Sequence, residues 1–304
     1  MKIYVACPSD TVTGGPELLH QLAAELNKHD GIEAVIFDPM SQVCRVPQVY
    51  AEQYKNPIAA KPPDIEDFVI YPEIWARLAN VRPGNNAIYW MSVDNYFPHT
   101  PKSEWFRFKP GILHIAQSKY SIDFLTDVLS VDPDQIIVIT DYVNEDYLES
   151  DIDTMRKPAV LYNPAKGMEY TEKIIALAPD IDFVPIRGMA RHEIRDLMLH
   201  SMVYIDFGSF PGKDRLPREA GACGMCLITG RRGTARYSQD LNLHSGYKIH
   251  EANYADLGKV VEIIRDIFAN FELHQKRFAG YRASVRAERD KFRAGVQNLA
   301  EVLR

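Results

Sequence analysis

The sequence predicts an α/β protein of two Rossmann-like domains, each a doubly wound parallel sheet, that face a cleft. Apolar runs of strand length alternate with stretches of helical period along almost the whole chain, which is the pattern of strand–helix–strand units. Many of these runs are continuous, as in strands that are covered on both faces. The chain has 304 residues, and single cores usually stop growing at roughly 250–300 residues.

Six strands are expected in the first half of the chain. They are Ile3–Ala6, Ala34–Phe37, Phe68–Tyr71, Ala87–Met91, Ile112–Ala116 and Ile136–Ile139. Between the first two, Pro16–Asn27 places Leu18, Leu22 and Leu26 on one face at helical spacing. This stretch therefore predicts a helix that covers the sheet.

Five strands and four helices are expected in the second half. The strands are Ala159–Tyr162, Ile181–Pro185, Met202–Ile205, Cys226–Thr229 and Tyr247–Ile249. The helices are Thr171–Leu177, Arg191–His200, Leu216–Ala222 and Ala255–Phe271.

A polar stretch that ends at Pro158 separates the two sets of strands. We therefore expect one domain over residues 1–155, a second over 156–275, and a C-terminal helix over 276–304 that could pack back on the first domain. This last segment has eight Lys or Arg against three Asp or Glu, so it predicts a basic face. Two interpretations stay open, a solvated packing helix and a contact with an anionic membrane surface or lipid-linked substrate.

Composition narrows the class of protein. A net charge of −6 argues against nucleic-acid binding. The N-terminal apolar run is too short for a signal peptide and no window resembles a membrane span. We therefore expect a cytoplasmic protein that could also lie peripherally at the inner face of the membrane.

Cys223 and Cys226 form a lone CxxC, which we interpret as packing residues. No metal site is expected, because Asp151-Ile152-Asp153 lies in the polar linker.

Ligands of doubly wound sheets bind beyond the carboxyl ends of the strands, and paired glycines follow the first strand. Residues 8–22, PSDTVTGGPELLHQL, pass through Gly14 and Gly15 to Pro16 at a plausible helix start. Such glycines let the backbone approach a ligand, and the helix N-terminus offers N–H groups to an anion. The alternative is that they only permit a tight turn.

A second candidate site is the stretch GSFPGKDRLPREAGACGMCLITG, residues 208–230. Lys213, Asp214 and Arg215 follow a strand and precede a helix, an arrangement that suits a diphosphate. Glu219, one turn inside that helix, can accept both hydroxyls of a ribose. The alternative for Glu219 is a partner of the helix dipole, worth about 0.3–1 kcal/mol.

Two further turns could complete this site. Lys166, in YNPAKGMEY (162–170), stands just after a strand, where its ammonium could meet a phosphate; a plain surface lysine is the alternative. Gly233 and Thr234, in GRRGTA (230–235), follow the next strand and could supply backbone donors.

These residues resemble a known family. GGPELLHQLAAEL is similar to the glycine loop and helix of glycosyltransferases with the GT-B fold, and NPAKG falls where those enzymes carry a lysine. PREAGACGMCLITGRRGTA resembles the P-x-E-A-x-A-C-G-x-P-V element of glycosyltransferase family 4 and its relatives. The chain also resembles the compact glycosyltransferases of bacterial capsule and O-antigen gene clusters.

The resemblance implies transfer of a sugar, without a metal, from a nucleotide-diphosphate donor to a carbohydrate of a bacterial surface polysaccharide. A UDP-sugar is the default donor, and the N-terminal domain would take an oligosaccharide or lipid-linked acceptor. The residues implied at the donor are Glu219 for the ribose, Lys166 with Arg215 or Lys213 for the diphosphate, and Gly14 and Gly15 along the cleft.

One position departs from the family pattern. A second glutamate is expected eight residues before Glu219, and Pro211 stands there. Asp214 or Asp206 could substitute for this sugar-contacting carboxylate, so Asp214 is a candidate catalytic residue.

Transfer also needs a group that activates the acceptor hydroxyl. In YWMSVDNYFPH (89–99), Asp94 follows an expected strand among aromatics that suit sugar stacking. We take Asp94 as the first candidate base, His99 as the second and Glu73 as the third, while Asp94 as a turn-former is the alternative. His114, inside an apolar run, is interpreted as a core histidine.

Two other functions fit the same fold. One is a non-hydrolysing sugar-nucleotide 2-epimerase, which would act on a nucleotide sugar without any acceptor. The other is a binding subunit that keeps the donor site and has lost the chemistry, which Pro211 would explain.

Overall fold

The computed structural model describes residues 1–105, 107–251 and 254–304. The chain divides into two compact units. The first unit comprises Met1–Asp141, Pro211–Lys213 and Arg289–Arg304, and the second comprises Tyr142–Phe210 and Asp214–Glu288.

The first unit is built on a six-stranded parallel sheet in the order β2-β1-β3-β4-β5-β6. Its strands are β1 (Lys2–Ala6), β2 (Glu33–Phe37), β3 (Phe68–Pro72), β4 (Asn86–Trp90), β5 (Leu113–Ala116) and β6 (Ile136–Val138). Its helices are α1 (Gly14–Leu26), α2 (Gln48–Tyr54), α3 (Ala76–Val81), α4 (Tyr96–His99) and α5 (Lys119–Asp123). Short turns of other helix types are η1 (Glu73–Trp75), η2 (Val93–Asn95), η3 (Lys102–Glu104), η4 (Phe124–Val128) and η5 (Pro133–Gln135).

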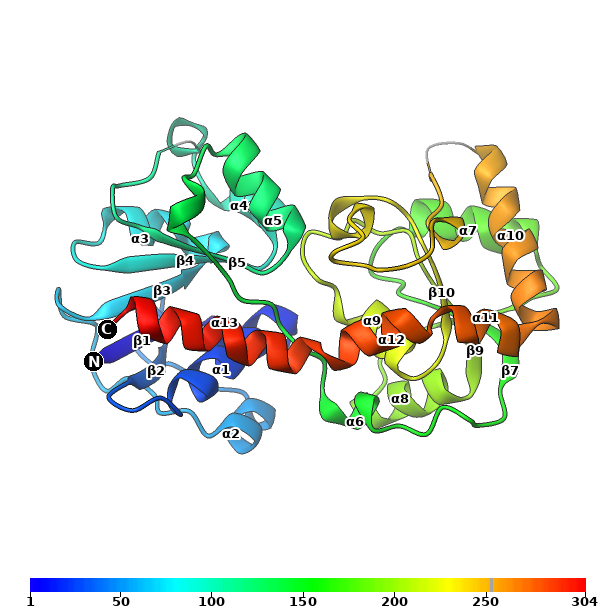
Figure 1. The fold of residues 1–304 in the computed structure, drawn as a ribbon, viewed down its shortest axis with the longest axis horizontal. Helices are drawn as coiled ribbons and strands as arrows, with labels where there is room; N and C mark the ends of the chain where they lie inside the picture. The colour runs from blue at the N-terminus through cyan, green and yellow to red at the C-terminus, as the bar shows by residue number, and fades with distance from the viewer. Residues whose placement is uncertain (106, 252–253) are drawn as a thin grey trace. The chain divides into compact units, whose positions relative to one another are not determined.

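Side chains alternate between the two faces of this sheet, and each face is covered. Tyr4, Val69 and Ile88 pack with residues of α3 and η4 in one apolar core. On the other side the C-terminal helix α13 (Glu288–Val302) lies beside α1, where Arg293 Nε is 3.8 Å from Glu25 Oε1. Figure 1 shows this helix, in red, running along the sheet of the first unit toward the C-terminus.

The second unit has a four-stranded parallel sheet in the order β10-β9-β7-β8. The strands are β7 (Lys157–Tyr162), β8 (Asp182–Pro185), β9 (Ser201–Asp206) and β10 (Cys226–Thr229). The helices are α6 (Glu145–Leu148), α7 (Met168–Leu177), α8 (Arg191–Leu199), α9 (Arg215–Ala222), α10 (Tyr254–Ala269), α11 (Phe271–Arg277) and α12 (Ala279–Arg286), with 3₁₀ turns η6 (Gly233–Arg236) and η7 (Ser245–Tyr247).

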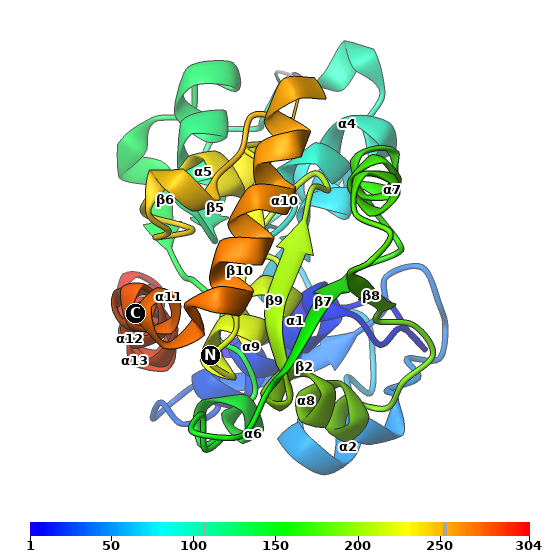
Figure 2. The ribbon, with the colours of Figure 1, turned by 90° about the vertical axis from the view of Figure 1, so that its right-hand side faces the viewer.

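Two helical layers enclose this second sheet. Parallel strands joined by right-handed crossovers place α7 on one face and both α8 and α9 on the other, while α10 packs on α7 and α12 on α9. Figure 2 shows these helices around β7, β9 and β10. Cys223 and Cys226 are free thiols fully buried in the apolar core of this unit, as the packing interpretation of the CxxC requires.

The expected fold class of two parallel-sheet α/β domains is confirmed, with two corrections to its elements. Tyr247–Ile249 is not a strand: it overlaps η7, and Lys248 makes a single parallel bridge to Thr229. The Tyr247 side chain explains the turn, because its ring lies 4.7 Å from that of Phe278 and its hydroxyl 2.7 Å from His274 Nδ1.

The second correction concerns the C-terminal segment 276–304, which is not one helix: it holds the end of α11, then α12 and then α13. The breaks fall at Phe278 and Ala287, where the backbone leaves regular helical geometry. Arg282 donates to the Gln275 carbonyl oxygen at 2.9 Å across the first break.

The units differ in extent from the ranges expected from the sequence. The first continuous segment of the first unit runs to Asp141, whereas residues 1–155 were expected, and Val143 and Tyr147 already pack in the core of the second unit. No helix in the described part of the chain has both the length and the apolar character needed to cross a membrane.

Candidate functional site

A lysine and two aspartates meet at the carboxyl ends of β7 and β9. Lys166 Nζ forms an ion pair with Asp214 and lies 3.3 Å from Asp206 Oδ2. The same ammonium stands 4.3 Å from the centre of the Phe210 ring. We call Lys166, Asp206 and Asp214 the lysine cluster; all three belong to the second unit.

Two glycines allow the loops that carry this cluster to approach each other. Gly167 has φ +69°, and a Cβ there would lie 2.5 Å from the Gly208 nitrogen. A Cβ on Gly208 would lie 2.5 Å from Lys166 Cδ. Side chains at either position would therefore push the β7–α7 loop away from the β9–α9 loop.

The two aspartates have different environments. Asp206 is 1% exposed and accepts hydrogen bonds from the Tyr204 hydroxyl at 3.1 Å and the Gly208 N–H at 2.9 Å. Asp214 is 26% exposed. Loss of hydration raises the pKa of Asp214 to about 6, and nearby Lys166 opposes the shift.

Helix α9 begins directly after the lysine cluster and carries Glu219. Asp214 is its N-cap residue, and Arg218 Nε donates to the Asp214 carbonyl oxygen at 3.2 Å. Glu219 is half-buried one turn into the helix. Burial raises the pKa of Cys223 to about 12, and the negative charge of Glu219 adds to that shift.

The loop after β10 reaches the same neighbourhood. Gly233 has φ +55°, and a Cβ there would overlap the Phe210 carbonyl oxygen. Thr234, which is buried, donates its N–H to that oxygen at 2.9 Å. Gly233 and Thr234 therefore contact the residue whose ring lies under Lys166.

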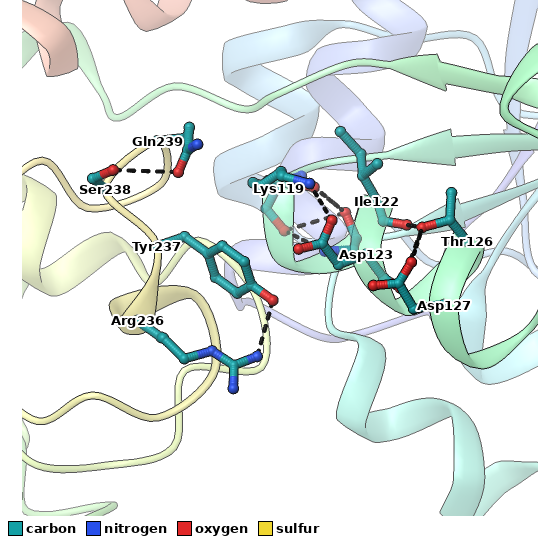
Figure 3. A network of polar contacts seen from close by, with 11 residues as sticks. Lys119, Ile122, Asp123, Thr126, Asp127, Arg236, Tyr237, Ser238 and Gln239 are labelled. Carbon is teal, nitrogen blue, oxygen red and sulfur yellow. Dashed lines mark hydrogen bonds and ion pairs between the residues drawn. The ribbon is translucent and has the colours of Figure 1, made fainter.

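Farther along this loop, Arg236 donates to the Tyr237 hydroxyl at 2.9 Å, and its guanidinium lies 5.0 Å from the ring centre (Figure 3). The loop also holds Arg232, whose Nε lies 3.2 Å from Glu251 Oε1.

The candidate bases of the first unit lie after β3 and β4. Asp94 is exposed and accepts a hydrogen bond from the Tyr120 hydroxyl at 2.7 Å. His99 is also exposed, with Nδ1 2.7 Å from the Asn95 carbonyl oxygen. Tyr120 sits on α5, whose Lys119 and Asp123 form an ion pair along the helix (Figure 3).

Glu73 is a buried carboxyl at the end of β3. It accepts the Met91 N–H at 3.1 Å, so it holds the backbone where β4 ends. Burial raises the pKa of Glu73 to about 7, although hydrogen bonds from backbone N–H groups oppose the shift. Gly15 is near the same turn, because a Cβ there would lie 3.7 Å from Met91 Cε. Gly14 precedes it as the first residue of α1.

Pro211–Lys213 belongs to the first unit, although the residues on either side belong to the second. The Pro211 carbonyl oxygen accepts the Val93 N–H at 3.0 Å. Lys213 donates its N–H to Gln117 Oε1 at 3.0 Å and its ammonium to Thr140 Oγ1 at 2.8 Å. Lys213 and Asp214 are thus neighbours in sequence whose side chains bind different units.

The predicted residues therefore fall into two groups. Lys166, Asp214, Arg215, Glu219, Gly233 and Thr234 belong to the second unit, and Gly14, Gly15, Asp94, His99 and Lys213 to the first. His114 is a core residue, as expected: it accepts the Trp90 indole N–H at 3.0 Å, and burial lowers its pKa to about 4.

Sequence reasoning assigned no role to Phe210, Tyr120 or Gln117. The sequence places Gln117 and Tyr120 just after the expected strand Ile112–Ala116, at the end of the sheet where ligands bind, but indicates no role for either. Phe210 carried no such signal beyond its place in the 208–230 stretch.

Comparison with known proteins gives matches at the level of structure. No family model and no curated protein matches the sequence. A glycosyltransferase from Rickettsia africae superposes with a TM-score of 0.67 at 14% identity, covering 99% of this chain and 97% of that one. HepE of Anabaena, solved with UDP and glucose, gives 0.66 at 13% identity, covering 100% and 99%.

A third match is WaaG, a glycosyltransferase of lipopolysaccharide biosynthesis, with a TM-score of 0.60 at 11% identity and 99% coverage of both chains. All three superpositions extend over both units of this chain. The chain has the GT-B fold. The resemblance to GT-B enzymes is thereby confirmed for the fold, while membership of family 4 stays a prediction.

Proposed function

We propose that this GT-B protein is a glycosyltransferase that moves a sugar from a nucleotide-diphosphate donor to a carbohydrate acceptor of a bacterial surface polysaccharide. The observation that carries the proposal is the lysine cluster with Glu219, at the strand ends where doubly wound sheets bind ligands. The similar structures support it: HepE was solved in complex with UDP and glucose, and WaaG acts in lipopolysaccharide biosynthesis. A UDP-sugar is the default donor.

Each residue of the second unit has a proposed part in donor binding. The Lys166 ammonium and the Arg215 guanidinium stabilise the diphosphate, which gains charge as the sugar leaves. Glu219 accepts the ribose hydroxyls. Gly233 and Thr234 lie in the loop that contacts Phe210. Because the Thr234 N–H already donates to the Phe210 carbonyl oxygen, Gly233 is the residue proposed to offer its backbone N–H to the nucleotide.

The first unit is proposed to take the acceptor, an oligosaccharide or a lipid-linked sugar. Asp94 accepts the proton of the attacking hydroxyl, and the Tyr120 hydroxyl bound to it fixes its orientation. His99 is the second candidate for this proton. We place the enzyme in the cytoplasm, at the inner face of the membrane, and we propose that it acts without a metal or nucleic-acid partner.

Thermal shift with a panel of nucleoside diphosphates and nucleotide sugars tests the donor site. A ligand at about 100 times its dissociation constant should stabilise the fold by roughly 2.7 kcal/mol. Glu219→Ala should lose this shift, while Glu262→Ala, an exposed carboxylate on α10, should retain it. If no nucleotide stabilises the wild-type protein, the proposed donor site is wrong.

Product analysis then separates transfer from the alternatives. The nucleotide sugar that binds is incubated with and without oligosaccharide acceptors. Consumption that depends on an acceptor supports transfer, whereas isomerisation without one identifies an epimerase. Tight binding with no turnover in either reaction identifies a binding subunit.

A further inference from the structure

The Lys166 ammonium is paired with two carboxylates in this structure, and it also donates to the Ser209 carbonyl oxygen at 3.4 Å. The Asp214 carboxylate forms an ion pair with the Lys166 ammonium, and Asp206 Oδ2 lies 3.3 Å from Lys166 Nζ. One cation therefore faces two anionic groups, and Phe210 closes a further side at 4.3 Å. A diphosphate that approaches Lys166 meets a cluster that already holds an excess of acidic groups, and like charges at short range repel.

The two carboxylates differ in how easily each could move away from Lys166. Asp206 is 1% exposed and is fixed by the Tyr204 hydroxyl and the Gly208 N–H. Asp214 is 26% exposed and lies at the start of α9. Only Asp214 can turn away without leaving hydrogen-bond donors unsatisfied in the core.

The Asp214 carboxylate also has an alternative hydrogen-bond partner at the N-terminus of α9. It is the N-cap residue of α9, but its carboxylate binds Lys166 and makes no capping hydrogen bond in the described helix. An N-cap aspartate ordinarily accepts the N–H of the second or third helical residue. The third residue here is Pro217, which has no N–H, so the Leu216 N–H is the available donor.

We propose that Asp214 is a gate on Lys166: it occupies the place of the donor diphosphate in the free protein and must release the lysine before the diphosphate binds. The released carboxylate turns to the N-terminus of α9, where it is a favourable cap. This inference rests on the proposed function, because it assumes that Lys166 is the diphosphate ligand.

The gate makes donor binding depend on pH. The charged and titratable groups that act on Asp214 are Lys166, Asp206 and Arg218, with the Tyr204 hydroxyl beside Asp206. Because the pKa of Asp214 is about 6, its carboxyl is mainly ionised and paired at about pH 8 and mainly protonated at about pH 5. Protonation removes the competing charge, so the gate opens as the pH falls.

Calorimetric titration of the wild type and Asp214→Asn tests the gate. The probes are inorganic pyrophosphate and whichever of UDP, GDP, ADP and CDP binds the wild type most tightly. At about pH 8, two units above this pKa, Asp214→Asn should bind up to roughly a hundredfold more tightly than the wild type, since one pKa unit corresponds to a tenfold change. At about pH 5 the two should bind alike. The ionisation of the probe cancels in this ratio.

Three variants complete the design. Asp180→Asn removes an exposed carboxylate paired with Arg265 in the same unit, and it should bind as the wild type does at every pH. Asp214→Ser, which keeps a residue suited to capping, should reproduce the Asn variant and replaces it if that protein does not fold. Lys166→Met should lose binding at both pH values.

The outcomes distinguish the two proposals. If the wild type binds and the Asp214 variants bind equally well at both pH values, or more weakly, the gate is wrong and the donor site stands. If the wild type and all variants bind none of the probes, the proposed donor site falls and the gate falls with it.

Discussion

Arg218 and Glu288 form a buried ion pair that ties α9 to the start of α13. Arg218 Nη1 lies 2.7 Å from Glu288 Oε2, and the side chains are 2% and 7% exposed. The same guanidinium donates to the Asp214 carbonyl oxygen. Asp214, Arg218 and Glu288 all belong to the second unit, so Arg218 joins the first residue before α9 to the first residue of α13 within that unit.

Loss of one partner of this pair should be costly. Arg218→Met leaves the Glu288 carboxylate buried without its cation, and removal of one member of a buried pair typically costs about 3–5 kcal/mol. Urea unfolding should show this loss of stability. The double variant Arg218→Met/Glu288→Leu should lose less than the sum of the single changes. Additive losses would show that the two side chains do not stabilise each other.

Two glycines should respond in opposite ways to alanine. Gly233 has φ +55° and a Cβ there would overlap the Phe210 carbonyl oxygen, whereas Gly258, inside α10, has open space around it. Gly233→Ala should destabilise the fold by more than about 1 kcal/mol. Gly258→Ala should stabilise it by roughly 0.5–1 kcal/mol, the usual gain inside a helix. Melting temperatures of the two variants check both signs, and an equal response would contradict the assigned backbone geometry.

The sequence predicted the strands well where burial alone determines them. The expected strand Phe68–Tyr71 became β3, Phe68–Pro72, which is buried along its whole length. Tyr247–Ile249 is shorter and has Lys248 at its centre, and it became a turn in which the Tyr247 ring contacts His274 of α11 and Phe278. Two apolar residues on either side of a lysine therefore predict a strand less well than the continuous apolar run of β3.

The candidate site was predicted less completely than the fold. The rule that ligands bind at strand ends pointed to Lys166 and Asp214 separately. Their ion pair depends on two loops meeting through Gly167 and Gly208, a contact between segments far apart in sequence. Likewise, nothing in the pattern separates Lys213 from Asp214, although the two side chains bind different units.

Asp94→Asn should slow the proposed transfer without weakening donor binding. Loss of a general base typically costs 10²–10⁴ in rate, so kcat should fall in that range while the thermal shift with the donor stays at the wild-type value. Tyr120→Phe removes the hydrogen bond to Asp94 and should give a smaller fall in kcat. Asp127→Asn, an exposed carboxylate of the same unit, serves as the control. If Asp94→Asn keeps full activity, Asp94 is not the base, and His99 becomes the first candidate.

Glu73 should make the stability of the wild-type protein fall as the pH rises. Its pKa is raised by burial from 4.5 to about 7 in the folded protein, so between these values the folded state binds more protons than the unfolded state. The stabilisation from this carboxyl is therefore complete below about pH 4.5 and is lost as the pH rises through about 7. The loss amounts to about 3 kcal/mol at most, at 1.36 kcal/mol per pKa unit. Glu73→Gln keeps an oxygen that can accept the Met91 N–H but cannot ionise, so its stability should not fall with this slope. Urea unfolding of both proteins between about pH 5 and pH 8 measures their free energies of unfolding. The free energy of unfolding of Glu73→Gln should increase relative to that of the wild type as the pH rises. A difference between them that stays constant over this range would show that Glu73 does not titrate there.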